Sequence, residues 1–126
     1  MGPKCIMVIG PTIADNDKFK QAIIPYAEVY TKQNFENIPG FIQSNVCELL
    51  ILEFPESFES ELQVISEIRQ MRPSADIILL TDSGDKEMIA KALNYGVRDI
   101  FRSPYNHELI TERVIGLLKY GGASAM

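Results

Sequence analysis

The hydrophobic pattern of the chain alternates between short apolar runs and longer segments whose apolar residues recur at helical spacing. Five runs rich in apolar or β-branched residues predict strands at 5–9, 28–31, 48–53, 75–81 and 97–101. A run that is apolar at every position, such as 5–9, is typical of a parallel strand buried on both faces. The repeated alternation predicts a parallel sheet with crossover helices.

Helices are expected between these strands. One helix is expected over residues 17–24, with Asp17 as its cap and Pro25 at its end. Ser57 is expected to cap a second helix, which Pro73 stops. Further helices follow 83–85 and the expected cap Asn106, while segment 34–45 gives only a weak apolar stripe. The expected buried positions of the last three helices are Leu62, Ile65, Ile68, Met88, Ile89, Ala92, Leu93, Leu109, Ile110, Val114, Leu117 and Leu118.

Short loops and right-handed crossovers favour one topology, a flavodoxin-like doubly wound sheet of five parallel strands in the order 2-1-3-4-5. Helices then cover both faces. We expect one domain over residues 1–120 and a disordered tail over 121–126. The carboxyl ends of the strands share one edge, which carries Gly10, Pro11, Glu53, Thr81 and Ser103. In open α/β sheets this edge is where ligand sites are found.

Composition narrows the range of partners. The chain has 126 residues, 12 basic against 17 acidic side chains and a net charge of -5, so no basic patch predicts a nucleic-acid partner. No apolar stretch approaches the roughly 20 residues that span a bilayer, and residues 1–4 have no signal-peptide design. We therefore expect a cytoplasmic protein with no membrane span.

The two cysteines, Cys5 and Cys47, are both expected in buried strands. They are far apart in sequence and have no CxxC spacing. We expect buried, reduced thiols rather than a redox or metal pair. His107 is the only histidine and is expected to be exposed in the first turn of a helix, so no metal site and no cofactor is predicted.

Several segments resemble the receiver domains of bacterial response regulators (CheY-like). The similar segments are 49–55, 77–81, 92–99, 103–105 and 108–114, and the resemblance covers nearly the whole chain. It implies the flavodoxin-like fold inferred above. It also implies transfer of a phosphoryl group to an aspartate, which requires a Mg²⁺ ion held by carboxylates.

The residues at the positions of the family's catalytic groups are altered. Gly10 and Pro11 stand where the family has its acidic pair, so neither can bind a metal through a side chain. Asp15 or Asp17 could replace them only if the loop folded back. Asp17 is better explained as a helix cap and Asp15 as a solvated loop residue.

The phosphoacceptor position carries Glu53, whose extra methylene displaces the carboxylate from in-line geometry. Two interpretations of Glu53 stay open: a permanent negative charge at the site, or a carboxylate that accepts loop N–H bonds. Thr81 retains the hydroxyl of the family. Ser103 replaces its lysine, so the fixed counter-charge for a phosphoryl group is lost, and Ile100 replaces its switch aromatic. The chain therefore looks like an atypical or pseudo-receiver.

Three functions follow from these observations. The first is a non-catalytic signalling or assembly module that binds a protein partner or a fused output domain, as in the pilus-assembly localisation ATPases, whose amino-terminal module is similar to a pseudo-receiver. Lys91, Asp99 and Arg113 are candidate residues for a homodimer through the fourth helix, fifth strand and fifth helix. The second is a divergent receiver that can still be phosphorylated. The third is a flavodoxin-like ligand-binding enzyme, but residues 10–15 lack a phosphate-binding motif.

Overall fold

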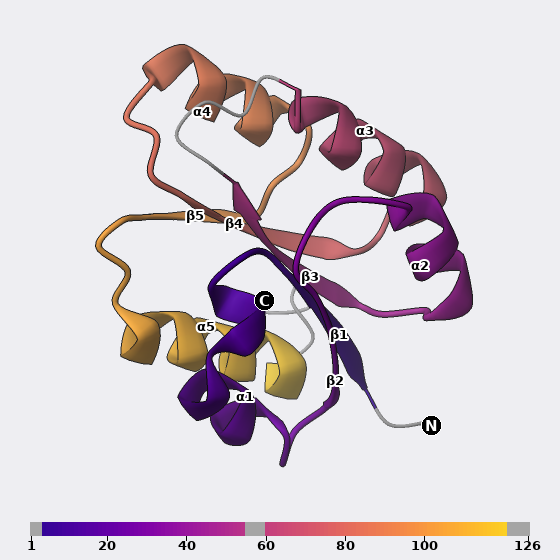
Figure 1. The fold of residues 1–126 in the computed structure, drawn as a ribbon, viewed down its shortest axis with the longest axis vertical. Helices are drawn as coiled ribbons and strands as arrows, with labels where there is room; N and C mark the ends of the chain where they lie inside the picture. The colour runs from indigo at the N-terminus through magenta and orange to yellow at the C-terminus, as the bar shows by residue number, and fades with distance from the viewer. Residues whose placement is uncertain (1–3, 55–59, 121–126) are drawn as a thin grey trace.

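The computed structural model describes residues 4–54 and 60–120. Five strands form a single parallel sheet in the order β2-β1-β3-β4-β5 (Figure 1). They are β1 (Cys5–Ile9), β2 (Glu28–Lys32), β3 (Leu49–Phe54), β4 (Asp76–Thr81) and β5 (Asp99–Arg102). This confirms the flavodoxin-like, CheY-like architecture expected from the sequence.

Helices cover both faces of the sheet. Figure 1 shows α2 (Ile38–Ser44), α3 (Leu62–Met71) and α4 (Lys86–Asn94) on one face, and α1 (Asp17–Ile23) and α5 (His107–Tyr120) on the other. A short 3-10 helix, η1 (Ile13–Asp15), follows β1. The weakly patterned segment 34–45 contains α2. Within the described ranges, no helix is both long and apolar enough to cross a bilayer.

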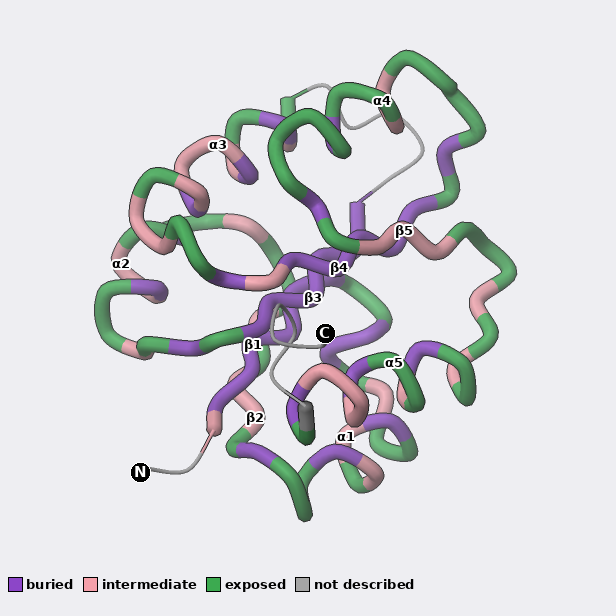
Figure 2. Tube along the Cα trace, turned by 180° about the vertical axis from the view of Figure 1, so that it is seen from behind, coloured by how far each residue is buried: buried purple, intermediate pink, exposed green. Residues whose placement is uncertain are grey.

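The strands divide the core into two layers because successive side chains point to opposite faces. Along β1, Met7 and Ile9 pack toward α2, α3 and α4, whereas Ile6 and Val8 pack toward α1 and α5. All five residues of β1 are buried, as a central parallel strand requires. Figure 2 shows the buried strands between helices whose outer surfaces are exposed.

The helix ends agree with the sequence in part. The side chains of Asp85 and Asn106 accept backbone N–H bonds at the starts of α4 and α5. Gly96 ends α4 with a φ of 88°, the left-handed conformation that glycine tolerates. Asp17 was predicted as the cap of α1, but Asn16 caps it by accepting from the N–H of Phe19 at 2.9 Å. The expected Ser57 cap and the expected tail at 121–126 lie outside the described residues.

Two leucines that were expected in the core are exposed. Leu93 is 51% exposed and Leu109 is 49% exposed. Each lies next to a fully buried residue, Ala92 in α4 and Ile110 in α5. Since neighbouring helix positions are about 100° apart around the axis, a helix that buries Ala92 or Ile110 turns the adjacent leucine outward.

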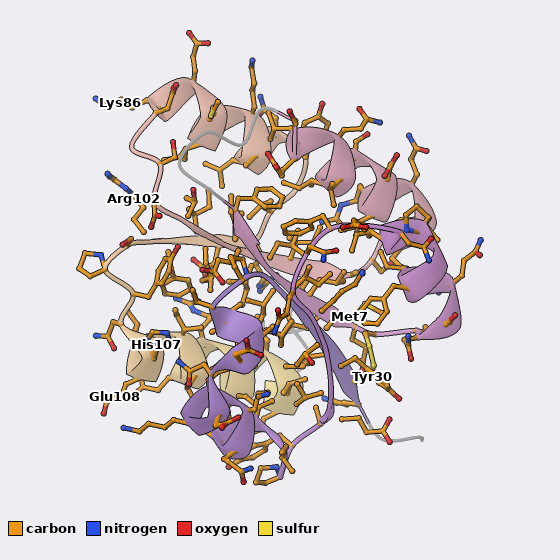
Figure 3. All side chains as sticks on the ribbon, viewed as in Figure 1. Met7, Tyr30, Lys86, Arg102, His107 and Glu108 are labelled. Carbon is orange, nitrogen blue, oxygen red and sulfur yellow. A yellow bond between two sulfur atoms is a disulfide. The ribbon has the colours of Figure 1, made fainter. Side chains whose placement is uncertain are left out.

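The prediction of free thiols in strands was wrong. Cys5 and Cys47 form a disulfide, and Cys47 precedes β3 rather than lying in it (Figure 3). The pairing follows from the strand order, because β1 and β3 are neighbours and the N–H of Glu48 donates to the carbonyl of Cys5. The Cα atoms of the two cysteines are 4.7 Å apart, within the usual disulfide range.

Candidate functional site

The candidate site lies at the carboxyl edge of the sheet. Parallel pairing brings Phe54 opposite Thr81 and Thr81 opposite Arg102, so β3, β4 and β5 end side by side. Gly10 follows β1, which pairs with β3 through Ile9 and Leu52. The edge therefore gathers Gly10, Glu53, Thr81 and Ser103, as the sequence predicted.

Glu53 is buried, and its carboxylate binds the loop that follows β1. Its Oε1 accepts from the backbone N–H groups of Thr12 at 2.9 Å and Ile13 at 2.8 Å. Its Oε2 accepts from the Thr12 hydroxyl at 2.6 Å. These are charge-assisted bonds, which are stronger than bonds between neutral groups. Of the two interpretations left open above, the geometry matches the carboxylate that accepts loop N–H bonds.

Gly10 is required by the position of Glu53. A Cβ added at Gly10 would overlap the Cβ of Glu53 and lie 2.7 Å from its Oε1. The N–H of Gly10 also donates to the carbonyl of Lys32 at 2.9 Å, which fixes the backbone there. No side chain can therefore occupy the first acidic-pair position without a shift of backbone.

The other acidic residues near this loop have different partners. Asp15 is exposed, as expected, and its carboxylate accepts from the Gln33 side-chain amide at 2.7 and 2.8 Å. Asp17 forms an exposed ion pair with Lys20 at 3.5 Å. Pro11 is exposed. Within residues 4–54 and 60–120, no group of three or more His, Cys, Asp or Glu side chains is placed to hold a metal ion.

Thr81 is completely buried at the end of β4 and holds the β4–α4 loop. Its hydroxyl oxygen accepts from the N–H of Ser83 at 3.0 Å, and the Ser83 hydroxyl oxygen accepts from the N–H of Asp85 at 3.1 Å. Ser83 is also buried. The retained hydroxyl thus has a local structural partner in addition to its place at the site.

Ser103 and its neighbours form the outer part of the edge. Ser103 is exposed, and its N–H donates to the carbonyl of Thr81 at 3.1 Å. Arg102 is exposed and points away from the sheet, on the same side as Lys86 (Figure 3). Its guanidinium lies beside Gly84, on the α4 side of the edge.

Tyr105 is half-buried beside the site, and its hydroxyl donates to Asp82 at 3.5 Å. Burial raises the pKa of the Tyr105 phenol, and the negative charges of Asp82 and Glu53 raise it further. Its ring meets the ring of His107 edge-on at 6.2 Å. His107, which was expected to be exposed, is therefore half-buried.

Of the residues suggested for a dimer surface, the structure brings two together. Arg113 Nε lies 3.1 Å from Asp99 Oδ2 within the chain. Lys91 instead lines an open hollow of about 460 Å³ beside residues of α3. Ile100, at the family's switch position, is half-buried against the core. The exposed Leu93 and Leu109 belong to the helices that flank β5.

Sequence reasoning missed three residues of this edge. Thr12 was not considered as a partner of Glu53, because the two are 41 positions apart. Ser83 and Tyr105 were noted only as loop and motif residues. A signal for Ser83 existed: three polar residues at alternate positions, Thr81, Ser83 and Asp85, are the pattern of consecutive side-chain turns.

Solved structures similar to this chain include receiver domains of response regulators. The BeF3-activated receiver domain of DrrB superposes with a TM-score of 0.77 and 22% identity, over 94% of this chain and 99% of that one. Against the longer DrrB response regulator of Thermotoga maritima, an OmpR/PhoB homolog, this chain spans only 54% of the length. No protein-family model matches the chain.

Two further similar structures have other descriptions. An atypical orphan response regulator, described as having a phosphorylation-independent regulatory mechanism, gives a TM-score of 0.74 at 14% identity, over 94% of this chain and 98% of that one. A putative pilus assembly-related protein from Burkholderia pseudomallei gives a TM-score of 0.66 at 14% identity, over 92% of this chain and 90% of that one. The chain therefore has the fold of the receiver domains of response regulators, as the resemblance of its sequence implied.

Proposed function

We propose that this chain is a cytoplasmic, non-catalytic pseudo-receiver that acts through protein contacts and is not switched by phosphorylation at position 53. The observation that carries the proposal is the set of three hydrogen bonds from Thr12 and Ile13 to Glu53. Both carboxylate oxygens accept bonds, and the side chain is only 7% exposed. A nucleophile in this position lacks the in-line access that phosphoryl transfer needs.

The surrounding residues support the same conclusion. Mg²⁺ takes oxygen ligands in octahedral geometry, and Gly10 and Pro11 offer it no side-chain oxygen. Ser103 supplies no positive charge. Glu53 instead joins the end of β3 to the loop after β1, so it holds the edge of the sheet in one arrangement.

The structural neighbours make such a role reasonable. One is described as an orphan regulator with a phosphorylation-independent mechanism, and another as a pilus assembly-related protein. We infer that the partner of this chain is a protein, either separate or fused to it.

Intact mass measurement tests the proposal. The protein is incubated with Mg²⁺ and a small phosphodonor, beside an active receiver domain as positive control. We expect the mass of this chain to stay unchanged while the control gains one phosphoryl group. An acid-labile gain that disappears in Glu53→Gln would establish the rival function, a divergent but active receiver.

The surface formed by α4, β5 and α5 is our candidate for a homodimer. It carries the Asp99–Arg113 pair, and Leu93 and Leu109 are exposed on its two helices. Light scattering across a concentration series should give a dimer for the wild type and a monomer for Arg113→Glu. Lys18→Glu, on α1, is the matched control and should remain dimeric. A wild type that is monomeric throughout would remove this surface from the proposal.

A further inference from the structure

The neighbouring strands β1 and β3 are joined at both of their ends. At the carboxyl end, Glu53 of β3 binds the loop after β1. At the amino end, Cys5 of β1 is bonded to Cys47, two residues before β3 begins. The bond closes a separation of 42 positions, which contains η1, α1, β2 and α2. This second connection plays no part in the function proposed above.

The two sulfurs are held by the fold, not by chance proximity of mobile segments. Cys5 is 8% exposed and Cys47 is 3% exposed, and both belong to the core layer under α2 and α3. The hydrogen bond from Glu48 N–H to the Cys5 carbonyl, at 3.2 Å, fixes the backbone between them. Two thiols placed this way react with each other more readily than with a second molecule.

The two cysteines differ in their surroundings. Cys47 lines an open hollow of about 470 Å³ at the amino edge of the sheet, together with Lys4, Met71 and Arg72. The adjacent Val46 is 71% exposed, so the connection between α2 and β3 reaches the surface. Cys5 does not line this hollow. Cys47 is thus the cysteine that a small thiol compound entering the hollow meets first, although neither residue is more than 8% exposed.

We propose that Cys5 and Cys47 are a thiol–disulfide exchange pair whose reaction partner is a small disulfide of the glutathione type, with Cys47 as the point of attack. In the oxidising direction, the Cys47 thiolate attacks one sulfur of glutathione disulfide and releases one glutathione thiolate. The Cys5 thiolate then attacks the Cys47 sulfur and releases the second. The protein loses two protons and two electrons, and the small disulfide is reduced to two thiols.

The state of this pair decides how firmly the amino ends of β1 and β3 are connected. When it is oxidised, the segment from α1 to α2 is closed covalently into the sheet. When it is reduced, the same segment is held only by packing and by the strand ladder. Exchange would thus adjust the stability of one end of the sheet and leave Glu53 at the other end untouched.

The experiment uses the whole chain in a series of glutathione to glutathione disulfide ratios, followed by alkylation and intact mass measurement. Under oxidising ratios we expect a monomer that takes up no alkyl group. Under reducing ratios we expect a monomer that takes up two alkyl groups, at Cys5 and Cys47. Hydrogen exchange at the Glu48 amide should become about tenfold faster or more on reduction, because a local cross-link is lost. Two alkylated thiols at every ratio, disulfide-linked dimers, or stable glutathione adducts on the wild type would each overturn the proposal.

Single substitutions test the order of attack. Cys5→Ala leaves Cys47 alone and should form a glutathione adduct, whereas Cys47→Ala should react at least about tenfold more slowly, because its remaining thiol belongs to a residue that does not line the hollow. The opposite order would overturn the assignment of Cys47. Circular dichroism checks that both variants fold. If either does not, the alkylation pattern of the wild type still decides whether the pair exists.

Discussion

The two halves of the carboxyl edge are organised in different ways. On the β1–β3 side, the bonds to Glu53 span 40 and 41 positions in the sequence. On the β4–β5 side, Thr81 and Ser83 hold their loop through bonds that span two positions. The first half depends on the assembled sheet, whereas the second is made by the local chain. Substitutions in the first half should therefore affect the whole fold more strongly.

Gly10→Ala should have the largest effect. Its new methyl group would overlap the Cβ of Glu53. The Gly10 N–H is bonded to the Lys32 carbonyl and Glu53 pairs with Leu80 in the sheet, so a shift of either backbone disturbs these bonds. We expect the free energy of unfolding to fall by about 3 kcal/mol, as for an overpacked core. Urea unfolding followed by circular dichroism measures it.

Gly116→Ala in α5 is the matched control. Within the described part of the chain, no atom other than those of its chain neighbours and of the backbone of α5 lies within 4 Å of its added Cβ. Because alanine favours helix over glycine, this variant should be more stable by about 0.5–1 kcal/mol. An equal loss of stability in both variants would show that the close approach of Gly10 and Glu53 has no special importance.

Glu53→Gln should come next. The amide has nearly the same shape, but its NH₂ group cannot accept a bond, and the charge that strengthens all three bonds is gone. We expect a loss of about 2 kcal/mol in urea unfolding, since bonds to a charged acceptor contribute more than bonds to a neutral amide. Increased proteolysis or hydrogen exchange in residues 10–15 would locate the change, and a wild-type pattern there would contradict it.

Thr81→Val tests the β4–β5 half. Valine keeps the volume of threonine but removes the acceptor for the Ser83 N–H. We expect the free energy of unfolding to fall by about 1 kcal/mol. Faster hydrogen exchange should be confined to the β4–α4 loop. A loss larger than that of Glu53→Gln would reverse the comparison between the two halves.

The pH dependence of stability gives the smallest expected effect. The pKa of Tyr105 is raised in the folded state, so the unfolded chain releases this proton first as the pH rises. Its contribution to stability is complete below about pH 10 and is lost above that value. Tyr105→Phe should show a shallower decline of stability at alkaline pH than the wild type. Tyr26→Phe, at an exposed tyrosine, should decline as the wild type does.

Much of the fold could be predicted because periodicity reports burial directly. The runs at 5–9 and 75–81 correspond to β1 and β4, and the spacing of Leu62, Ile65 and Ile68 identified the buried face of α3. The exposed Leu93 and Leu109 were missed for a physical reason. An apolar stripe does not reveal its own edges, which depend on how each helix is rotated against the sheet.

The site could be predicted only as a set of positions. Topology alone placed Gly10, Glu53, Thr81 and Ser103 at one edge. The partner of Glu53 could not be inferred, because the path of the loop after β1 determines which N–H groups face it. The pairing of Cys5 with Cys47 was accessible in principle, since the expected strand order already put the starts of strands one and three side by side. The strand order alone does not fix the register of these two strands, and the register determines whether the two cysteines meet.

The close approach of Gly10 and Glu53 also limits how the chain could regain a metal-binding pair. The overlap is with the Cβ of residue 53, an atom that every amino acid except glycine possesses. Replacing Glu53 with aspartate would therefore not make room for an acidic side chain at position 10. The backbone between β1 and η1 would have to adopt another path first. An acidic pair at these positions would require a remodelled loop, and no succession of single side-chain exchanges at positions 10 and 53 provides it.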